Sequence, residues 1–233
     1  SVPYAVYAGC LAGSEEVKVR LLDSSKSLAR KEGADFLEIR EKEETTYPED
    51  FKLINQVYNF SLSLSENVEE VWKKLPKGSV RWGIKKAQKS DLTWSYGNSE
   101  KELREFYDLF ILTRKHRGVP GYPLGQFKDI LAKFGDKARI YVVRFEDKPV
   151  ASIFLIYHKK EVRYSFAGAI SDLEILRMQP YHLVLWEAIK DACQRGYTQF
   201  NFGGATLSAN EGGLYGFKKK WADEIIKVPS YYY

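Results

Sequence analysis

The sequence predicts an α+β fold, and the order of its apolar patterns is the main reason. Three strand-like segments, 139–145, 150–157 and 162–169, are separated by turns of only a few residues, which is typical of an antiparallel meander. Helical spacing of apolar residues precedes this meander and returns after it. No run of about 18 apolar residues occurs, so the sequence predicts no membrane-spanning helix.

The first part of the chain predicts one helix and two strands. The segment 14–31 has helical spacing, and Gly33 is the expected stop. Strand-like alternation follows at 36–40 and returns at 51–64, after an acidic loop that contains a proline. The apolar side of this helix is expected to consist of Val17, Leu21, Leu28 and Ala29.

Four helices are expected between residue 65 and the meander, and the first of them is capped by Ser65 and runs to about Leu75. A basic helix is predicted at about 79–89. Ser99 and Glu102 have the spacing of a capping box, in which each side chain satisfies an amide at a helix start. A turn rich in Gly and Pro at 118–123 separates that helix from the next, which Gly135 ends.

A long helix and one more strand are expected after the meander. Pro180 suits the first helical position, where a missing N–H costs nothing, and Gly196 is the expected stop. The strand 198–202 leads into Gly203-Gly204. The inward side of the long helix is predicted to hold Leu185, Trp186, Ile189, Ala192 and Cys193.

The composition indicates a folded, basic protein. The 233 residues contain 36 Lys and Arg against 31 Asp and Glu, and 44% are apolar, which excludes a disordered or collagen-like chain. Residues 1–70 have a charge balance of −6, so the rest carries +11. A cationic surface of this kind attracts phosphate groups.

Cys10 and Cys193 cannot form a disulfide framework, which favours a reducing compartment. No paired Cys and His spacing indicates a metal site. Because residue 1 is Ser and the only methionine is Met178, we expect the chain to be a piece of a longer protein.

The C-terminal part resembles the FemABX family. The resemblance is carried by the segment 201–204 and by the glycine-flanked run 212–221, which contains Phe217 and Lys218. The segments 185–189, 113–120 and 81–87 are similar to the family's preceding helix, its Arg-rich turn and its basic helix.

This resemblance implies a GNAT-like N-acyltransferase fold, whose central sheet splays open to admit an acyl donor. FemABX proteins contain two GNAT-like halves. Residues 1–58 would then close a first, truncated GNAT-like domain, and residues 59–233 would form a complete second one.

The implied function is an acyltransferase that moves an aminoacyl or acyl group onto an amine of a cell-envelope precursor. The implied acceptor is a lipid-linked or nucleotide-linked muropeptide, and the implied donor is aminoacyl-tRNA or acyl-CoA, with no tightly bound cofactor. Residues 176–180 lack the glycines of the usual GNAT pyrophosphate loop, which disfavours CoA because fewer backbone amides can wrap the phosphates. The resemblance also implies a cytoplasmic location, with contact to anionic lipid at the inner membrane surface as an option.

Two other functions stay open from the residues alone. One is a GNAT N-acetyltransferase that uses acyl-CoA. The other is a basic binding module for RNA or an anionic membrane, without catalysis.

By the resemblance, Lys218 is the expected catalytic residue, because a fixed cation stabilises the oxyanion that forms when an amine attacks an ester or thioester. The alternative is a solvated member of the lysine triplet 218–220. Phe217 is expected to bind the donor by stacking on its terminal adenosine. Its alternative is a core aromatic beside Trp221.

Five further cations are candidates for substrate binding. Arg114 and Arg117 suit a diphosphate, which guanidinium groups bind through paired hydrogen bonds, or they only oppose a helix dipole. Arg81, Lys85 and Lys86 suit the tRNA backbone or anionic lipid, or they form a solvated helix face.

Overall fold

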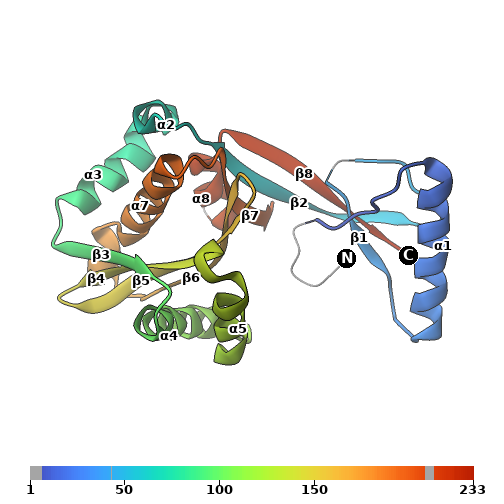
Figure 1. Cartoon of the computed structure of the whole chain (residues 1–233), viewed down its shortest axis with the longest axis horizontal. Coiled ribbons are helices and arrows are strands. Elements are labelled where there is room, and N and C mark those ends of the chain that lie inside the picture. The colour runs from blue at the N-terminus through green and yellow to red at the C-terminus, as the bar shows by residue number, and fades with distance from the viewer. Residues whose placement is uncertain (1–6, 43, 208–212) are drawn as a thin grey trace. The chain divides into compact units, whose positions relative to one another are not determined.

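The computed structural model describes residues 7–42, 44–207 and 213–233, which divide into two compact units (Figure 1). The larger unit contains residues 61–202 and 220–223. The smaller unit contains the residues up to Phe60 together with 203–219 and 224–233. The division of the chain into GNAT-like domains at 1–58 and 59–233 stays a prediction.

Five strands of an eight-stranded sheet organise the larger unit. The strands pair in the order β7-β6-β5-β4-β3. Neighbours from β3 to β6 are antiparallel, which confirms the predicted meander, and β7 is parallel to β6. The strands are β3 (Leu92–Gly97), β4 (Ala138–Phe145), β5 (Lys148–His158), β6 (Glu161–Ala169) and β7 (Gln199–Thr206).

Helices cover both faces of this sheet (Figure 1). On one face, α4 packs on β4, β5 and β6, and α5 packs beside it. On the other face, α7 packs on β4 and β5, and α3 packs against α7. None of the helices in the described part of the chain is long and apolar enough to cross a membrane. The helices are α2 (Val68–Lys74), α3 (Trp82–Gln88), α4 (Glu100–His116), α5 (Leu124–Phe134), α6 (Leu173–Arg177) and α7 (Pro180–Gln194), with short helical turns at Lys77–Arg81 and Gly135–Lys137.

The two faces follow from the alternation of side chains along β4. Ile140 and Val142 belong to the buried cluster that α4 and α5 complete with Phe106 and Phe127. Tyr141 points to the opposite face, where its hydroxyl donates to Asp191 of α7 at 2.7 Å.

Local signals fix the helices that carry the core. The predicted capping box at the start of α4 is present, with both Ser99 and Glu102 in their expected roles. Pro180 is the first residue of α7, as predicted. The five residues predicted to face inward on α7 are all buried.

β6 and β7 stay together for only a short distance. Their paired register covers Glu161–Arg163 on β6 and Gln199–Asn201 on β7. On its other side β6 continues to pair with β5 as far as Ala169. The part of β6 that begins at Tyr164 therefore lies beyond the β7 ladder, as expected for a sheet that splays open.

The smaller unit combines two helices, of which one continues into the larger unit, with three strands and the end of β7. Its strands pair in the order β1-β8-β2. A small core joins Leu22, Ile39, Phe51 and Tyr231. The elements are α1 (Glu15–Lys31), β1 (Glu38–Arg40), β2 (Lys52–Ser63), α8 (Leu214–Trp221) and β8 (Glu224–Tyr232), of which β2 and α8 continue into the larger unit.

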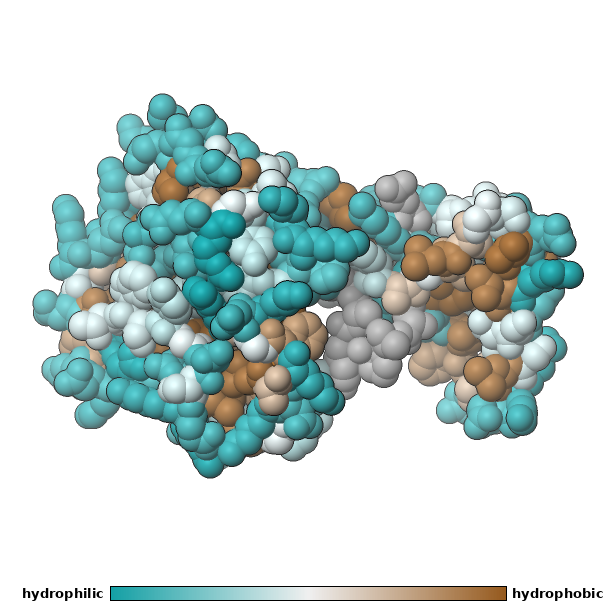
Figure 2. All heavy atoms as spheres, viewed as in Figure 1, coloured by the Kyte–Doolittle hydropathy of each residue, from teal (hydrophilic) through white to brown (hydrophobic). Residues whose placement is uncertain are grey.

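The predicted helix α1 is present, but the apolar residues expected on one of its sides are not the residues that it buries. Val17, Leu21 and Leu28 are 43%, 42% and 58% exposed. The helix buries Leu22 and Lys26 instead, and the ammonium of Lys26 pairs with Asp50 at 2.6 Å and lies 5.0 Å from the ring centre of Phe51. Figure 2 accordingly shows hydrophobic side chains on the surface of this unit.

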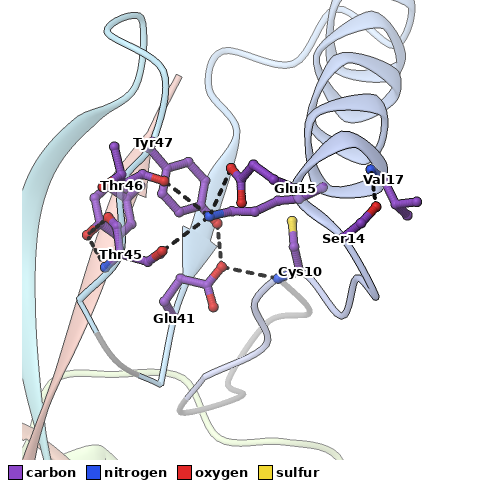
Figure 3. A network of polar contacts seen from close by, with 10 residues as sticks. Cys10, Ser14, Glu15, Val17, Glu41, Thr45, Thr46 and Tyr47 are labelled. Atoms are coloured by element: carbon purple, nitrogen blue, oxygen red, sulfur yellow. Dashed lines mark hydrogen bonds and ion pairs between the residues drawn. The ribbon is translucent and has the colours of Figure 1, made fainter.

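A polar network ties the start of the smaller unit together (Figure 3). The ammonium of Lys18 donates to the Thr45 hydroxyl at 3.2 Å. The carboxylate of Glu41 accepts from the Tyr47 hydroxyl and from the Cys10 amide. Burial and the Glu41 carboxylate raise the pKa of Tyr47, so its hydroxyl remains a donor at neutral pH.

Candidate functional site

Lys218 lies where β7 bends and α8 returns to it. Gly203 in β7 has a φ of 74°, a left-handed value that glycine adopts without strain. The next residue, Gly204, accepts a hydrogen bond from the Lys218 ammonium at 2.9 Å. This contact holds the ammonium in one direction within the smaller unit.

Burial distinguishes Lys218 from the other members of its triplet. Lys218 is 6% exposed, whereas Lys219 and Lys220 are exposed. The solvated alternative therefore does not describe Lys218, although its catalytic role stays a prediction. Phe217 is half-buried on the same helix, one turn before the buried Trp221.

A second polar group lies in the larger unit, where β6 leaves β7. Tyr164 of β6 and Tyr181 of α7 are half-buried, and Arg117 at the C-cap of α4 is near enough for its charge to influence the pKa of both hydroxyls. Burial raises the pKa of Tyr181 to about 12 and that of Tyr164 well above its usual value, while the Arg117 charge opposes both shifts. Both hydroxyls are therefore neutral donors at pH 7, beside a guanidinium.

Arg114 and Arg117 have different surroundings. The Nε of Arg114 donates to the Pro120 carbonyl at 2.9 Å, and its guanidinium lies 5.8 Å from the Tyr122 ring centre. Arg114 thus holds the turn after α4. Arg117 is exposed at the C-cap of α4, where a cation also opposes the helix dipole.

The three predicted cations near α3 also differ from one another. Arg81 is half-buried, with its guanidinium 5.9 Å from the Trp72 ring centre. Lys85 is exposed. Lys86 places its ammonium 5.2 Å from the ring centre of the exposed Trp82.

His182 is a residue that the sequence did not single out. Its ring occupies the space left by Gly83, where an added Cβ would lie 2.6 Å from the ring. The ring centre is 5.6 Å from that of Trp221. Burial and, to a lesser degree, the Lys220 charge lower the pKa of His182 to about 4, so the imidazole is neutral at pH 7.

No group of three or more metal-ligating side chains gathers within the described ranges.

Comparison with known proteins identifies the fold and the family. Residues 77–219 match the family described as the acetyltransferase (GNAT) domain, which is more than half of the chain. The chain belongs to this family. All seven residues predicted for the site lie within the matched range of this GNAT domain.

A curated relative of this GNAT domain is the UDP-N-acetylmuramoylpentapeptide-lysine N(6)-alanyltransferase of Weissella viridescens. The two are 26% identical over 141 residues, which is 57% of this chain and 41% of the relative. The chain thus spans about two fifths of the length of that relative.

Solved structures confirm the predicted GNAT-like α+β fold. The crystal structure of FemX matches with a TM-score of 0.70 at 15% identity, covering 100% of this chain and 82% of that one. The C-terminal domain of a putative lysylphosphatidylglycerol synthetase from Agrobacterium fabrum matches with a TM-score of 0.64 at 17% identity, covering 94% and 74%. Together with the curated relative, the FemX match confirms the predicted FemAB-related resemblance.

Proposed function

We propose that this GNAT domain is an acyltransferase that forms an amide on an amine of a cell-envelope precursor. The family match supports acyl transfer, and the name of the Weissella viridescens relative supports an aminoacyl group and a peptidoglycan precursor. The observation that carries the proposal is the buried ammonium of Lys218 on the Gly204 carbonyl. We expect the protein to act in the cytoplasm and to contact anionic lipid at the inner membrane surface.

In the proposed reaction the amine nitrogen attacks the carbonyl carbon of the donor ester. The carbonyl oxygen becomes an oxyanion, and Lys218 stabilises it because the ammonium is fixed before the reaction starts. The amide forms as the C–O bond to the donor breaks. The donor oxygen takes the electron pair and a proton, and the attacking nitrogen loses its own proton.

The N-terminus of α7 favours an aminoacyl ester over CoA. The amides of Met178, Gln179 and His182 donate to nearby backbone carbonyls at 3.0, 3.0 and 2.9 Å. Pro180 has no N–H to offer. A pyrophosphate needs several backbone amides at this point, and these are already used within the protein.

The acceptor is proposed to bind by its phosphates. Arg117 can meet a phosphate through paired hydrogen bonds, and the neutral hydroxyls of Tyr164 and Tyr181 add donors beside it. Arg114 supports this group by holding the turn after α4. Phe217 is proposed to stack on the terminal adenosine of the donor tRNA. Arg81, Lys85 and Lys86 are proposed to contact the phosphate backbone of that tRNA.

The test is transfer of radiolabelled alanine from alanyl-tRNA to UDP-N-acetylmuramoyl-pentapeptide, compared between two lysine variants. Lys218→Met keeps the length of the side chain but removes the charge, so turnover is expected to fall by roughly 10²–10³-fold. Lys219→Met removes an exposed charge from the same helix and is the matched control. Equal turnover in the two variants, at equal circular dichroism, would refute the role of Lys218.

Acetyl-CoA is the second candidate donor, because the matched family is described as an acetyltransferase domain. The same assay with labelled acetyl-CoA separates the two donors. Transfer from acetyl-CoA, together with a raised melting temperature in the presence of CoA, would replace the aminoacyl donor in the proposal.

A further inference from the structure

The larger unit has an aromatic edge that the proposed transfer chemistry does not use. Trp94 and Tyr96 of β3 are 41% and 47% exposed. Their rings are nearly parallel, with centres 6.3 Å apart and 21° between the planes. β3 ends the strand order of the sheet, so one of its edges faces no other described strand.

Charged and aromatic side chains hold Tyr96 in place. The Arg139 guanidinium lies 4.9 Å from its ring centre and pairs with Asp191 at 3.4 Å. The ring centre of Tyr141 lies 5.3 Å from that of Tyr96. We call Trp94, Tyr96 and Arg139 the aromatic platform, because these contacts fix the rings without covering them.

Helix α3, with Lys85 on it and Lys89 directly after it, lies on the same face of the sheet. Tyr96 contacts Tyr141, whose hydroxyl reaches Asp191 on α7, and α3 packs against α7. Only three residues separate the end of α3 from the start of β3. Lys85 and Lys89 are exposed, and residues 71–89 contain seven cations and no acid.

We propose that the aromatic platform binds single-stranded RNA, with bases stacked on Trp94 and Tyr96 and phosphates near Lys85 and Lys89. Every base offers a face that can stack on an aromatic ring, and lysines attract the backbone without reading sequence. The proposal goes beyond the amide-forming reaction and does not require it. If aminoacyl-tRNA is the donor, the platform gives that RNA a second contact, at protein residues far along the chain from Phe217 and Lys218.

Two other occupants fit the surface less well. A second copy that paired through β3 would bring its own α3 lysines to the same face, and the like charges would repel. A lipid surface would need a larger apolar area, because beyond Trp82, Trp94 and Tyr96 the exposed apolar residues of this unit, such as Val119 and Leu173, lie outside α3 and β3. The surface of the larger unit in Figure 2 is largely hydrophilic.

The experiment measures binding of the protein to a fluorescent, unstructured 12-nucleotide RNA by anisotropy at several salt concentrations. Trp94→Thr and Tyr96→Thr keep strand-forming residues at exposed positions, and each is expected to weaken binding roughly 10-fold or more. Phe134→Ala is the matched control, since Phe134 is 43% exposed on α5. Lys85→Glu and Lys89→Glu should lower the dependence of binding on salt, whereas Lys101→Glu, at an exposed position on α4, should not.

Several results would overturn the platform. One is equal RNA affinity in the Trp94 and Phe134 variants, and another is no binding of the RNA at low salt. Preferential binding to phosphatidylglycerol vesicles, or a dimer in light scattering that Tyr96→Thr dissociates, would assign the surface to lipid or to a second copy. RNA binding that depends on Trp94 while no acyl group is transferred would support the platform and contradict only the proposed function.

Discussion

Lys218 is the residue on which the proposed chemistry depends most. Taking an ammonium out of water costs several kcal/mol unless the charge is paired, and the Lys218 ammonium donates to the Gly204 carbonyl. Buried cations with this kind of setting are frequent at functional sites, where the charge acts on a substrate. The burial of Lys218 next to two exposed lysines therefore supports a functional role more strongly than the lysine triplet in the sequence does.

His182 gives a prediction at the same scale. Its pKa is lowered to about 4 in the folded protein, whereas an unfolded histidine titrates near about 6.5. Between these values the unfolded chain binds a proton that the folded protein does not, so His182 should reduce stability as the pH falls from about 6.5 to about 4. His182→Gln removes this titration.

The measurement is the urea midpoint of the parent protein and of His182→Gln from pH 7.5 to pH 4.5. The difference between the two should shift in favour of the variant as the pH falls. A difference that does not change with pH would contradict a neutral, buried imidazole.

The contact between α4 and β6 depends on one glycine. A Cβ at Gly168 would lie 2.3 Å from both the Leu109 carbonyl carbon and the Phe110 nitrogen. Both are backbone atoms, so no side-chain rotation relieves the clash. Helix α4 would have to move away from the sheet, together with the Arg117 that it positions.

Gly168→Ala is therefore expected to destabilise the protein by about 1–3 kcal/mol, the usual cost of overpacking. Gly125→Ala is the control, because no atom lies within 4 Å of its added Cβ and alanine favours the helix α5. Urea unfolding measures both. A Gly168 variant as stable as the Gly125 variant would show that α4 can shift at no cost.

Helices whose ends are marked by capping residues could be predicted from the sequence. The strand β8 and the buried side of α1 carry no such signal and could not. Ser99 with Glu102 marks α4, and Pro180 marks α7, because caps act within one turn of the chain. β8 was missed, and Pro229 would argue against a strand there, yet β8 lies between β1 and β2 in the sheet. The side of α1 that is buried depends on Asp50 and Phe51, which no pattern within α1 reveals.

At the scale of the whole molecule, the predicted boundary between residues 58 and 59 has a measurable consequence. β8 belongs to the smaller unit, where Tyr231 packs on Leu22, Ile39 and Phe51. A fragment of residues 59–233 would keep β8 but lose these partners. It should expose apolar surface and bind a hydrophobic dye.

Trimming β8 as well, to residues 61–223, removes Tyr231 and should reduce dye binding. The two fragments and the parent protein can be compared by dye fluorescence at equal concentration. Equal fluorescence from both fragments would show that residues 59–233 form a self-contained domain, as the sequence predicts.

The candidate site was only partly predictable for a reason that concerns the whole fold. Lys218 and Arg117 stand in family-like segments, so the resemblance found them. Tyr164 and Tyr181 come from β6 and α7, and only the fold brings them near enough for one to influence the pKa of the other. Such proximity requires the topology, since neither tyrosine stands in a motif.

The hydrogen bonds at the start of α7 also limit how this protein can change. Binding of a coenzyme diphosphate at this helix start would not follow from exchanging side chains, because the amides that must be released belong to the main chain at Met178, Gln179 and His182. Insertion of a flexible, glycine-containing loop ahead of Pro180 would be the smallest alteration that frees them.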